Sequence, residues 1–381
     1  MIAAIEKGAA VNNTLPTQRK YGLSITFSLE DFPHDVLMNP ALHDYTFSKD
    51  TNILIMKLSE AIRIEEFKVQ FAHTLDKHQE KSFFSSFHDA QVTDPVCIII
   101  PDNYTANKPV IINIEQEKSC SLGSIFIFVG KNSAVTFIEE DKSKLSSKNY
   151  SSHFIKIIGD KYSRITYITV QDKEATSYAH TTRQASLSNH AILQWIDCHF
   201  GGAVNMIETT SNLDGEGSKV ETNSLFVGDN TQRFDILVQA IHLAQNTSSN
   251  LVSRAALNDA AKAIYRGLIR VEPTAPKSNG YQKADMLLLG KDAQADPIPE
   301  LEIKNDDVTC THSATVGRVN TEDLFYLMSR GLNREEATRA LVEGFFIPII
   351  NNINIPEIRE HIIHMIDNKY TKKHEIGTIS V

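Results

Sequence analysis

The chain has 381 residues and a mass of 42.6 kDa, with 38 basic and 47 acidic side chains and a net charge of −9. A hydrophobic content of 41% and a charged content of 22% exclude wholesale disorder, a collagen-like chain and a coiled-coil rod. The acidic balance argues against binding to nucleic acid or anionic membranes, which needs clustered Lys and Arg, and no apolar run is long enough to span a bilayer. We therefore expect neither nucleic acid nor a membrane among its partners.

Residues 1–90 form a mixed zone that we expect to be partly helical. The run from Ser28 to Asp31 is typical of a helix start, and residues 58–71 carry apolar side chains at loosely helical spacing. The first eleven residues are interrupted by Glu6 and Lys7 and lack the apolar segment of a secretory signal. The four cysteines lie far apart and form no CxxC pair, so we expect a reducing, cytoplasmic setting without disulfides.

Residues 91–317 are a succession of short β-rich runs separated by turn residues, which predicts an all-β sandwich, barrel or solenoid. A turn followed by an apolar strand start recurs with a spacing near 30 residues, apart from one interval of 43. Such a period favours stacked coils that bury their inner faces on one another, although turn spacing alone leaves a sandwich open. The apolar anchors of this repeat are Val135, Ile165, Ile192, Val220, Ala263 and Ala295.

Residues 318–381 are predicted to be helical. Thr321 is the expected cap of a first helix that Gly331 ends, and Asn333 with Glu336 resembles a capping box for a second. Pro356 is a typical first residue of a third helix. This helical domain is expected to close the end of the β-body, although its face could also dock a partner.

Cys310 and His312 are the most notable local pair in the chain. On a strand, residues two apart share a face, so the thiolate and the imidazole could contact one metal ion. Sulfur and nitrogen suit iron or zinc, but two ligands do not complete a site. The alternative is a small buried cysteine beside a hydrogen-bonded histidine.

Other chemical motifs are absent or ambiguous. The sequence has no P-loop, no GxGxxG after a strand, no nucleophile elbow and no HExxH helix. Cys198 and His199 are adjacent, so on a strand they face opposite sides and do not share a metal. Glu300 and Asp307 could act as the acid and base of a polysaccharide-cleaving β-helix, but edge charges explain them equally well.

Residues 257–346 carry an ordered series of short motifs: YRG at 265–267, PELEI at 299–303, DDV at 306–308, CTH at 310–312, ATVG at 314–317, LFYL at 324–327 and SRG at 329–331. With these motifs the segment resembles the SufB/SufD family of iron–sulfur cluster assembly proteins, and a weaker resemblance extends from 84 to 346. The resemblance implies a right-handed parallel β-helix (residues 91–317) with an N-terminal mixed or helical region and a C-terminal helical domain.

Within the family, the chain resembles the SufD-type branch. Ala293 stands where the SufB-type branch has a cysteine, and Ser313 stands where that branch has a glutamate. The run CTHSATVG at 310–317 is similar to the CSHGATVG of the SufD type, with Ser313 in place of its glycine. The resemblance implies a non-catalytic scaffold subunit that pairs with a SufB-type subunit through the ends of their β-helices. It also implies binding of the SufC-type ATPase through the C-terminal helical region.

The resemblance also implies where the functional residues lie. His312, and after it Cys310, would contact iron or a nascent iron–sulfur cluster at the subunit junction, with no tightly bound cofactor otherwise. Phe325, Tyr326 and Arg330 would contact the ATPase, because aromatic area beside a charge is typical of binding hot spots; for Phe325 the alternative is packing within the helical domain. Two other functions stay open: a homodimeric, SufB-like scaffold that holds the cluster between two chains, and a polysaccharide-active enzyme.

Overall fold

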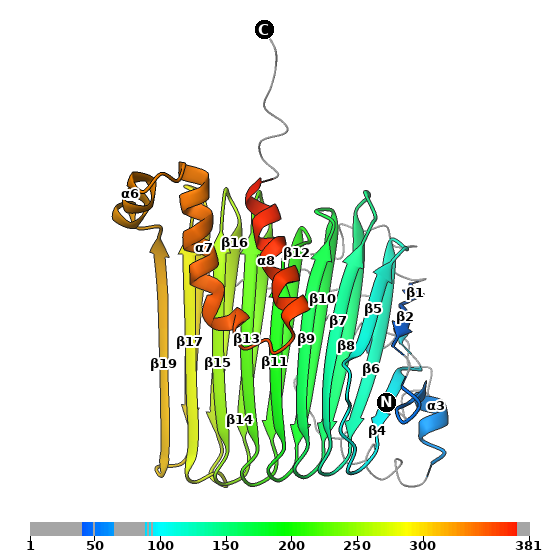
Figure 1. Cartoon of the computed structure of the whole chain (residues 1–381). Coiled ribbons are helices and arrows are strands. Elements are labelled where there is room, and N and C mark those ends of the chain that lie inside the picture. The colour runs from blue at the N-terminus through cyan, green and yellow to red at the C-terminus, as the bar shows by residue number, and fades with distance from the viewer. Residues whose placement is uncertain (1–39, 49, 65–87, 90, 93, 372–381) are drawn as a thin grey trace, which may run out of the picture.

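The computed structural model describes residues 40–48, 50–64, 88–89, 91–92 and 94–371. The chain winds into a β-solenoid of about eight turns, with helices of the C-terminal segment on one flank (Figure 1). Each turn adds one strand to each of two facing sheets, so that a strand pairs with the strand two places further along the chain. This pairing confirms the predicted solenoid and rules out the sandwich.

The two sheets, called sheet A and sheet B, are parallel except at the N-terminal end. There β3 runs antiparallel to β4, and β2 runs antiparallel to β5. Sheet A contains β1 (Ala41–Leu42), β3 (Leu54–Lys57), β4 (Val96–Ile100), β6 (Cys120–Val129), β8 (Asn149–Gly159), β10 (Ser177–Leu187), β12 (Val204–Leu213), β14 (Arg233–His242), β16 (Lys262–Val271) and β18 (Gln294–Ile303). Sheet B contains β2 (Asp44–Phe47), β5 (Val110–Gln116), β7 (Ala134–Ser143), β9 (Arg164–Lys173), β11 (Ile192–His199), β13 (Lys219–Gly228), β15 (Ser248–Leu257), β17 (Ser278–Leu288) and β19 (Val308–Arg318).

The register of the coils explains the sequence repeat. Val135 pairs with Ile165, but Ile165 pairs with Leu193, so the predicted anchor at the neighbouring residue 192 was one position early. Leu193 then pairs with Val220 in sheet B, whereas Ala263 lies on β16 in sheet A. The interval of 43 residues is therefore a step from one sheet to the other, and no coil of the solenoid is that long.

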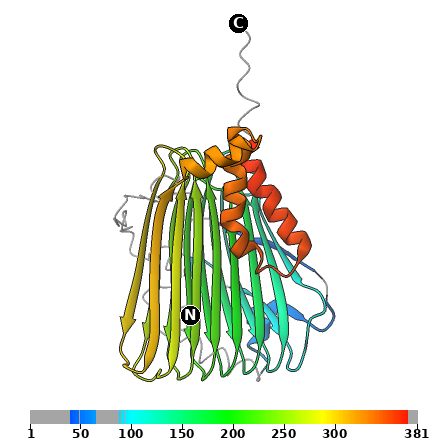
Figure 2. The ribbon, with the colours of Figure 1, turned by 60° about the vertical axis from the view of Figure 1, so that its left-hand side comes forward.

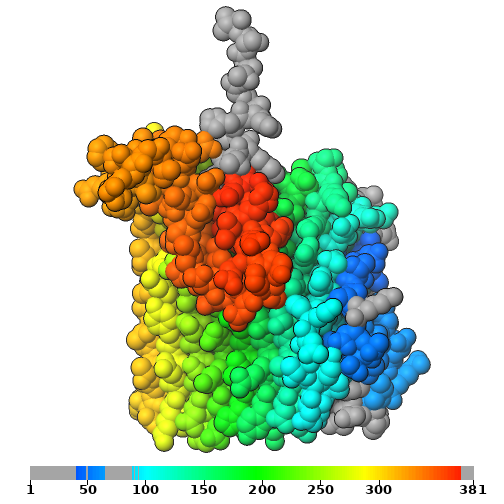
Figure 3. Space-filling model, in the orientation of Figure 1, coloured from blue at the N-terminus to red at the C-terminus, as the bar shows by residue number. Residues whose placement is uncertain are grey.

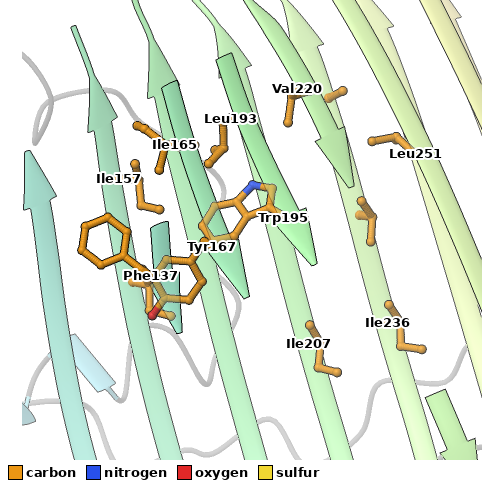
Figure 4. Close-up of a cluster of buried hydrophobic side chains, with 14 of the residues drawn as sticks. Phe137, Ile157, Ile165, Tyr167, Leu193, Trp195, Ile207, Val220, Ile236 and Leu251 are labelled. Carbon is orange, nitrogen blue, oxygen red and sulfur yellow. The ribbon is translucent and has the colours of Figure 1, made fainter. Parts of the chain in front are cut away.

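The space between the sheets is filled by side chains that alternate inward along each strand. In the central coils Tyr167 and Trp195 are fully buried, with ring centroids 5.3 Å apart, and Phe137 lies on the other side of Tyr167 (Figure 4). Because each coil buries its inner face on the next, the apolar row runs continuously along the solenoid axis.

The corners before the strands of sheet B need a left-handed backbone, which explains their Asn and Gly residues. Asn103 and Asn132 have φ values of 57° and 53°, and their N–H groups donate to carbonyls of the following coil at 2.7 and 3.0 Å. Asparagine tolerates this conformation at little cost. Tyr162 and His190 take the same corner position, and their rings stack 5.0 Å apart.

Three helices follow the last strand: α6 (Thr321–Ser329), α7 (Arg334–Ile350) and α8 (Pro356–Thr371). The capping box of Asn333 and Glu336 is confirmed, with both hydrogen bonds present. The predicted cap of the first helix was wrong by one residue, because the side chain of Asn320 accepts from the N–H of Glu322. None of the described helices is long and apolar enough to cross a membrane.

Helices α7 and α8 lie on the outer face of sheet B, so the expectation that the helical domain closes the end of the solenoid was wrong (Figures 1 and 2). The physical reason is an apolar patch on the flank, where Ile168, Ile196 and Leu225 of sheet B pack against Phe346 and Ile362. Burying this patch keeps α7 and α8 on the flank, and the space-filling view shows them covering the upper middle part of this face (Figure 3).

The described N-terminal residues contribute three short strands and one four-residue helix, α3 (Leu58–Ala61). This helix starts where residues 58–71 were expected to be helical, and the rest of that run from residue 65 lies outside the described residues, as does the predicted helix start at Ser28.

Candidate functional site

The C-terminal end of the solenoid is open. Strands β18 and β19 are the last strands of sheets A and B, and within the described ranges no strand pairs with their outer edges. Most of β19 is solvent-exposed, in contrast to the buried strands of the preceding coils. In Figure 1, β19 stands at the margin of the sheet with α6 above its end.

Cys310 and His312 lie on the inner face of this last strand, as their spacing predicts. They pair with Gly280 and Gln282 of β17, on the face from which Met286 enters the apolar core. Cys310 is half-buried against that core, whereas His312 is exposed at the open end. The two side chains therefore share one face at a place where another molecule can reach them.

The surroundings of Cys310 favour the thiol over the thiolate. Burial raises its pKa, and the backbone N–H of Gly280 only partly offsets this effect. A metal would have to displace the thiol proton on binding. Among the described residues, no three His, Cys, Asp or Glu side chains have metal-binding geometry, so one chain offers at most these two ligands here. Metal binding by Cys310 and His312 stays a prediction.

The aromatic residues of α6 point away from the protein. Phe325 and Tyr326 are 74% and 56% exposed, and only Leu324 of this helix is buried. Internal packing therefore does not explain Phe325. The guanidinium of Arg330 lies 5.2 Å from the Tyr326 ring centroid, so a cation and an aromatic ring form an exposed pair, and the exposed Phe325 is the preceding residue of the same helix.

No contact between Glu300 and Asp307, the two carboxylates considered for polysaccharide cleavage, is present among the described residues. Glu300 lies on β18, whereas Asp307 lies in the turn before β19. The neighbouring Glu302 is 2.5 Å from Arg270, whose hydrogen bond lowers the pKa of that carboxyl. An ionised carboxylate of this kind does not supply a general acid.

The two residues Cys198 and His199 face opposite sides of β11, as predicted. Cys198 lies in the apolar cluster beneath α7 and α8, and burial raises its pKa. His199 points inward and stacks on Phe226 at 5.4 Å.

A buried polar cluster inside the solenoid was missed from the sequence. Arg183 and Asp197 form an ion pair at 2.5 Å, and both side chains are almost completely buried. The Glu139 carboxylate accepts a hydrogen bond of 2.5 Å from the Tyr167 hydroxyl. The available signal was a charged residue at an inward position of a predicted strand, such as Glu139 two residues after the inward Phe137.

Comparison with known proteins places this chain in a family. Residues 111–345 match the family model described as "SUF system FeS cluster assembly, SufBD core domain". The chain belongs to the SufBD core family. The match spans the solenoid from β5 onward and includes Cys310, His312 and α6, so both parts of the candidate site lie within the SufBD core.

Several known proteins are similar to this chain. The chain is 28% identical to the iron–sulfur cluster assembly protein SufD of Bacillus subtilis, over 84% of this chain and 73% of that protein. It is 29% identical to a SufBD family protein of Staphylococcus saprophyticus, over 80% of this chain and 66% of the relative. A SufBD family protein of Mycobacterium bovis is 36% identical over 54% of this chain and 24% of its own length. The chain thus spans about two thirds to three quarters of the length of the first two relatives.

Proposed function

We propose that this chain is a non-catalytic, SufD-type scaffold subunit of iron–sulfur cluster assembly in the cytoplasm. Its open end would pair with a SufB-type subunit, and α6 with the start of α7 would bind a SufC-type ATPase. The observation that carries the proposal is the open last coil, where Cys310 and His312 share an accessible face. The relative named SufD supports the assembly role.

The two partner surfaces have different chemistry, which supports separate roles. The last coil offers free strand edges and a thiol–imidazole pair, whereas α6 offers exposed aromatic area and the Arg330 cation. Aromatic and arginine side chains carry much of the binding energy in protein interfaces. An imidazole suits iron and can exchange a proton near neutral pH, which fits the transient handling of a cluster that is cargo and not a resident cofactor.

The proposal is tested by co-purification of the tagged chain with SufB-type and SufC-type subunits from one cell. The wild type should recover both partners. Arg330→Glu should lose the ATPase but keep the SufB-type subunit, while His312→Ala should keep both and lose iron–sulfur absorbance. Arg164→Glu, a charge reversal at an exposed position on β9, is the matched control and should behave as wild type.

A homodimeric scaffold that holds the cluster itself is the second candidate function. It is favoured because the part of the chain that the structure describes shows no group of three metal ligands, whereas two chains would supply two thiolates and two imidazoles from Cys310 and His312. Recovery of neither partner, together with iron bound by the isolated chain and lost in Cys310→Ala, would put this function ahead of the SufD-type role.

A further inference from the structure

Helix α6 carries exposed aromatic side chains but has little apolar packing of its own. Leu324 is its one buried residue, and Leu324 belongs to none of the hydrophobic clusters that the described residues form. The helix stands above the end of β19, beyond the covered flank of sheet B (Figure 1). Because burial contributes so little, the direction of α6 depends on the two joints at its ends.

The joint after α6 offers little restraint. Gly331 has a φ value of 104°, and a Cβ at this position would have nothing within 4 Å. A glycine in open space changes its backbone angles at small cost, because no side chain has to move with it. This joint connects α6 to α7 but leaves the direction of α6 open, so the joint before the helix has to set it.

The joint before α6 is short and is tied to the preceding coil. Only Val319 and Asn320 separate Arg318, the last residue of β19, from the start of α6. The Arg318 guanidinium donates to the carbonyl of Gly290 at 2.7 Å and to the carbonyl of Lys291 at 3.1 Å. A planar guanidinium that donates from two nitrogens fixes a direction as well as a distance. The exit of the chain from β19 is therefore held at two points.

The corner that accepts these two hydrogen bonds is itself fixed in place. The N–H groups of Leu289 and Gly290 donate to the carbonyl of Leu257, one coil earlier, at 2.8 and 3.3 Å. A Cβ on Gly290 would lie 2.1 Å from the backbone N of Asp259, so the two corners are in close backbone contact. Such close packing resists displacement. Arg318 is thus fastened to a rigid part of the solenoid.

We infer that Arg318 is a positioning residue that orients α6 and so presents Phe325 and Tyr326 to a partner. The identity of that partner, the SufC-type ATPase, rests on the proposed function, whereas the orientation of α6 is a property of the isolated chain. A helix that samples many directions has to be ordered on binding, and this ordering lowers the affinity. Loss of Arg318 therefore weakens partner binding through α6.

The inference is tested by hydrogen–deuterium exchange of the purified chain and by titration with the SufC-type ATPase. Arg318→Gln should raise the exchange of residues 319–329 by about five- to tenfold and weaken ATPase binding by a similar factor, because two charge-assisted hydrogen bonds at an exposed position are lost. Arg318→Lys keeps the charge but not the two-point contact, so it should resemble Arg318→Gln. Arg164→Gln, at an exposed position on β9, is the control and should behave as wild type.

The thermal midpoint of each variant should stay within about 2 °C of wild type, so that a local change in α6 is separated from general destabilisation. Wild-type exchange of residues 319–329 in Arg318→Gln would overturn the inference, whatever the ATPase does. Wild-type exchange and affinity in Arg318→Lys would also overturn it, since charge alone would then suffice. Faster exchange of α6 in Arg318→Gln, with no ATPase binding by the wild type, supports the inference and removes the proposed partner.

Discussion

Glu139 is a carboxyl group enclosed between the two sheets, and its ionisation is linked to the stability of the solenoid. Burial raises its pKa from 4.5 to about 7, although the charge of Arg183 and the hydrogen bond from Tyr167 act in the opposite direction. The folded chain thus retains a proton that the unfolded chain releases between pH 4.5 and about 7. The stability associated with Glu139 falls as pH rises through this window, and the cost of ionisation is fully present above it.

Glu139→Gln removes this ionisation while leaving an acceptor for the Tyr167 hydroxyl. We expect the variant to gain stability relative to the wild type as pH rises from 5 to 8, by roughly 1 kcal/mol or more, or about 2 °C in Tm. Melting curves at both pH values measure the difference. Glu115→Gln makes the same change at an exposed position and should show no such trend; a flat difference for Glu139→Gln would mean that Glu139 titrates normally.

The buried ion pair of Arg183 and Asp197 is a second feature whose contribution to stability can be measured. Arg183 also donates to the Thr169 hydroxyl at 3.0 Å. Arg183→Met alone should cost about 3–5 kcal/mol, because Asp197 is left as an unpaired buried charge. The double variant Arg183→Met, Asp197→Leu should recover most of this loss in urea denaturation. If the losses of the single variants Arg183→Met and Asp197→Leu simply add in the double variant, the pair does not interact.

At the scale of elements, α6 and α7 differ in what their aromatic residues do. Phe346 of α7 is fully buried against sheet B, whereas Phe325 of α6 is 74% exposed. Phe346→Ala should cost about 3–5 kcal/mol and release the helices, seen as proteolytic cleavage between β19 and α8. Phe325→Ala should stay within about 0.5 kcal/mol of wild type and act only on partner binding. Equal stability losses would contradict this division.

Local sequence signals predicted the helices but not their position. The capping box at Asn333 and the start of α8 at Pro356 depend on a few neighbouring residues, and both are present. The docking of α7 and α8 on the flank depends on residues such as Ile168 and Leu225, which are far away in the chain. Because such contacts join distant segments, no local pattern in the helical region predicted them.

At the scale of the whole molecule, the coils stack so closely that their turns leave no room for a side chain at certain glycines. A Cβ on Gly215 would lie 2.0 Å from the backbone N of Asn189, one coil earlier. Gly215→Ala should therefore cost about 1–3 kcal/mol in urea denaturation. Gly344 in α7 has nothing within 4 Å, so Gly344→Ala should gain about 0.5–1 kcal/mol. A neutral Gly215→Ala would mean that the coils can separate locally.

The repeat of about 30 residues favoured stacked coils without excluding a sandwich, and it could not assign each anchor to a sheet. Val220 and Ala263 look alike as apolar strand starts, although they lie in different sheets. A turn pattern shows where the chain changes direction, but packing between coils determines which strands pair with one another.

The helical C-terminal segment and the shared face of Cys310 and His312 were predictable from capping signals and strand alternation, which are properties of neighbouring residues. The period of about 30 residues favoured a solenoid but left a sandwich open, and the resemblance to the SufB/SufD family implied the solenoid. The position of the helices on the flank, the burial of charges such as Arg183 and the open last coil became evident only from the folded structure. The reason is that burial depends on which distant segments come into contact, and the packing of the whole chain determines those contacts.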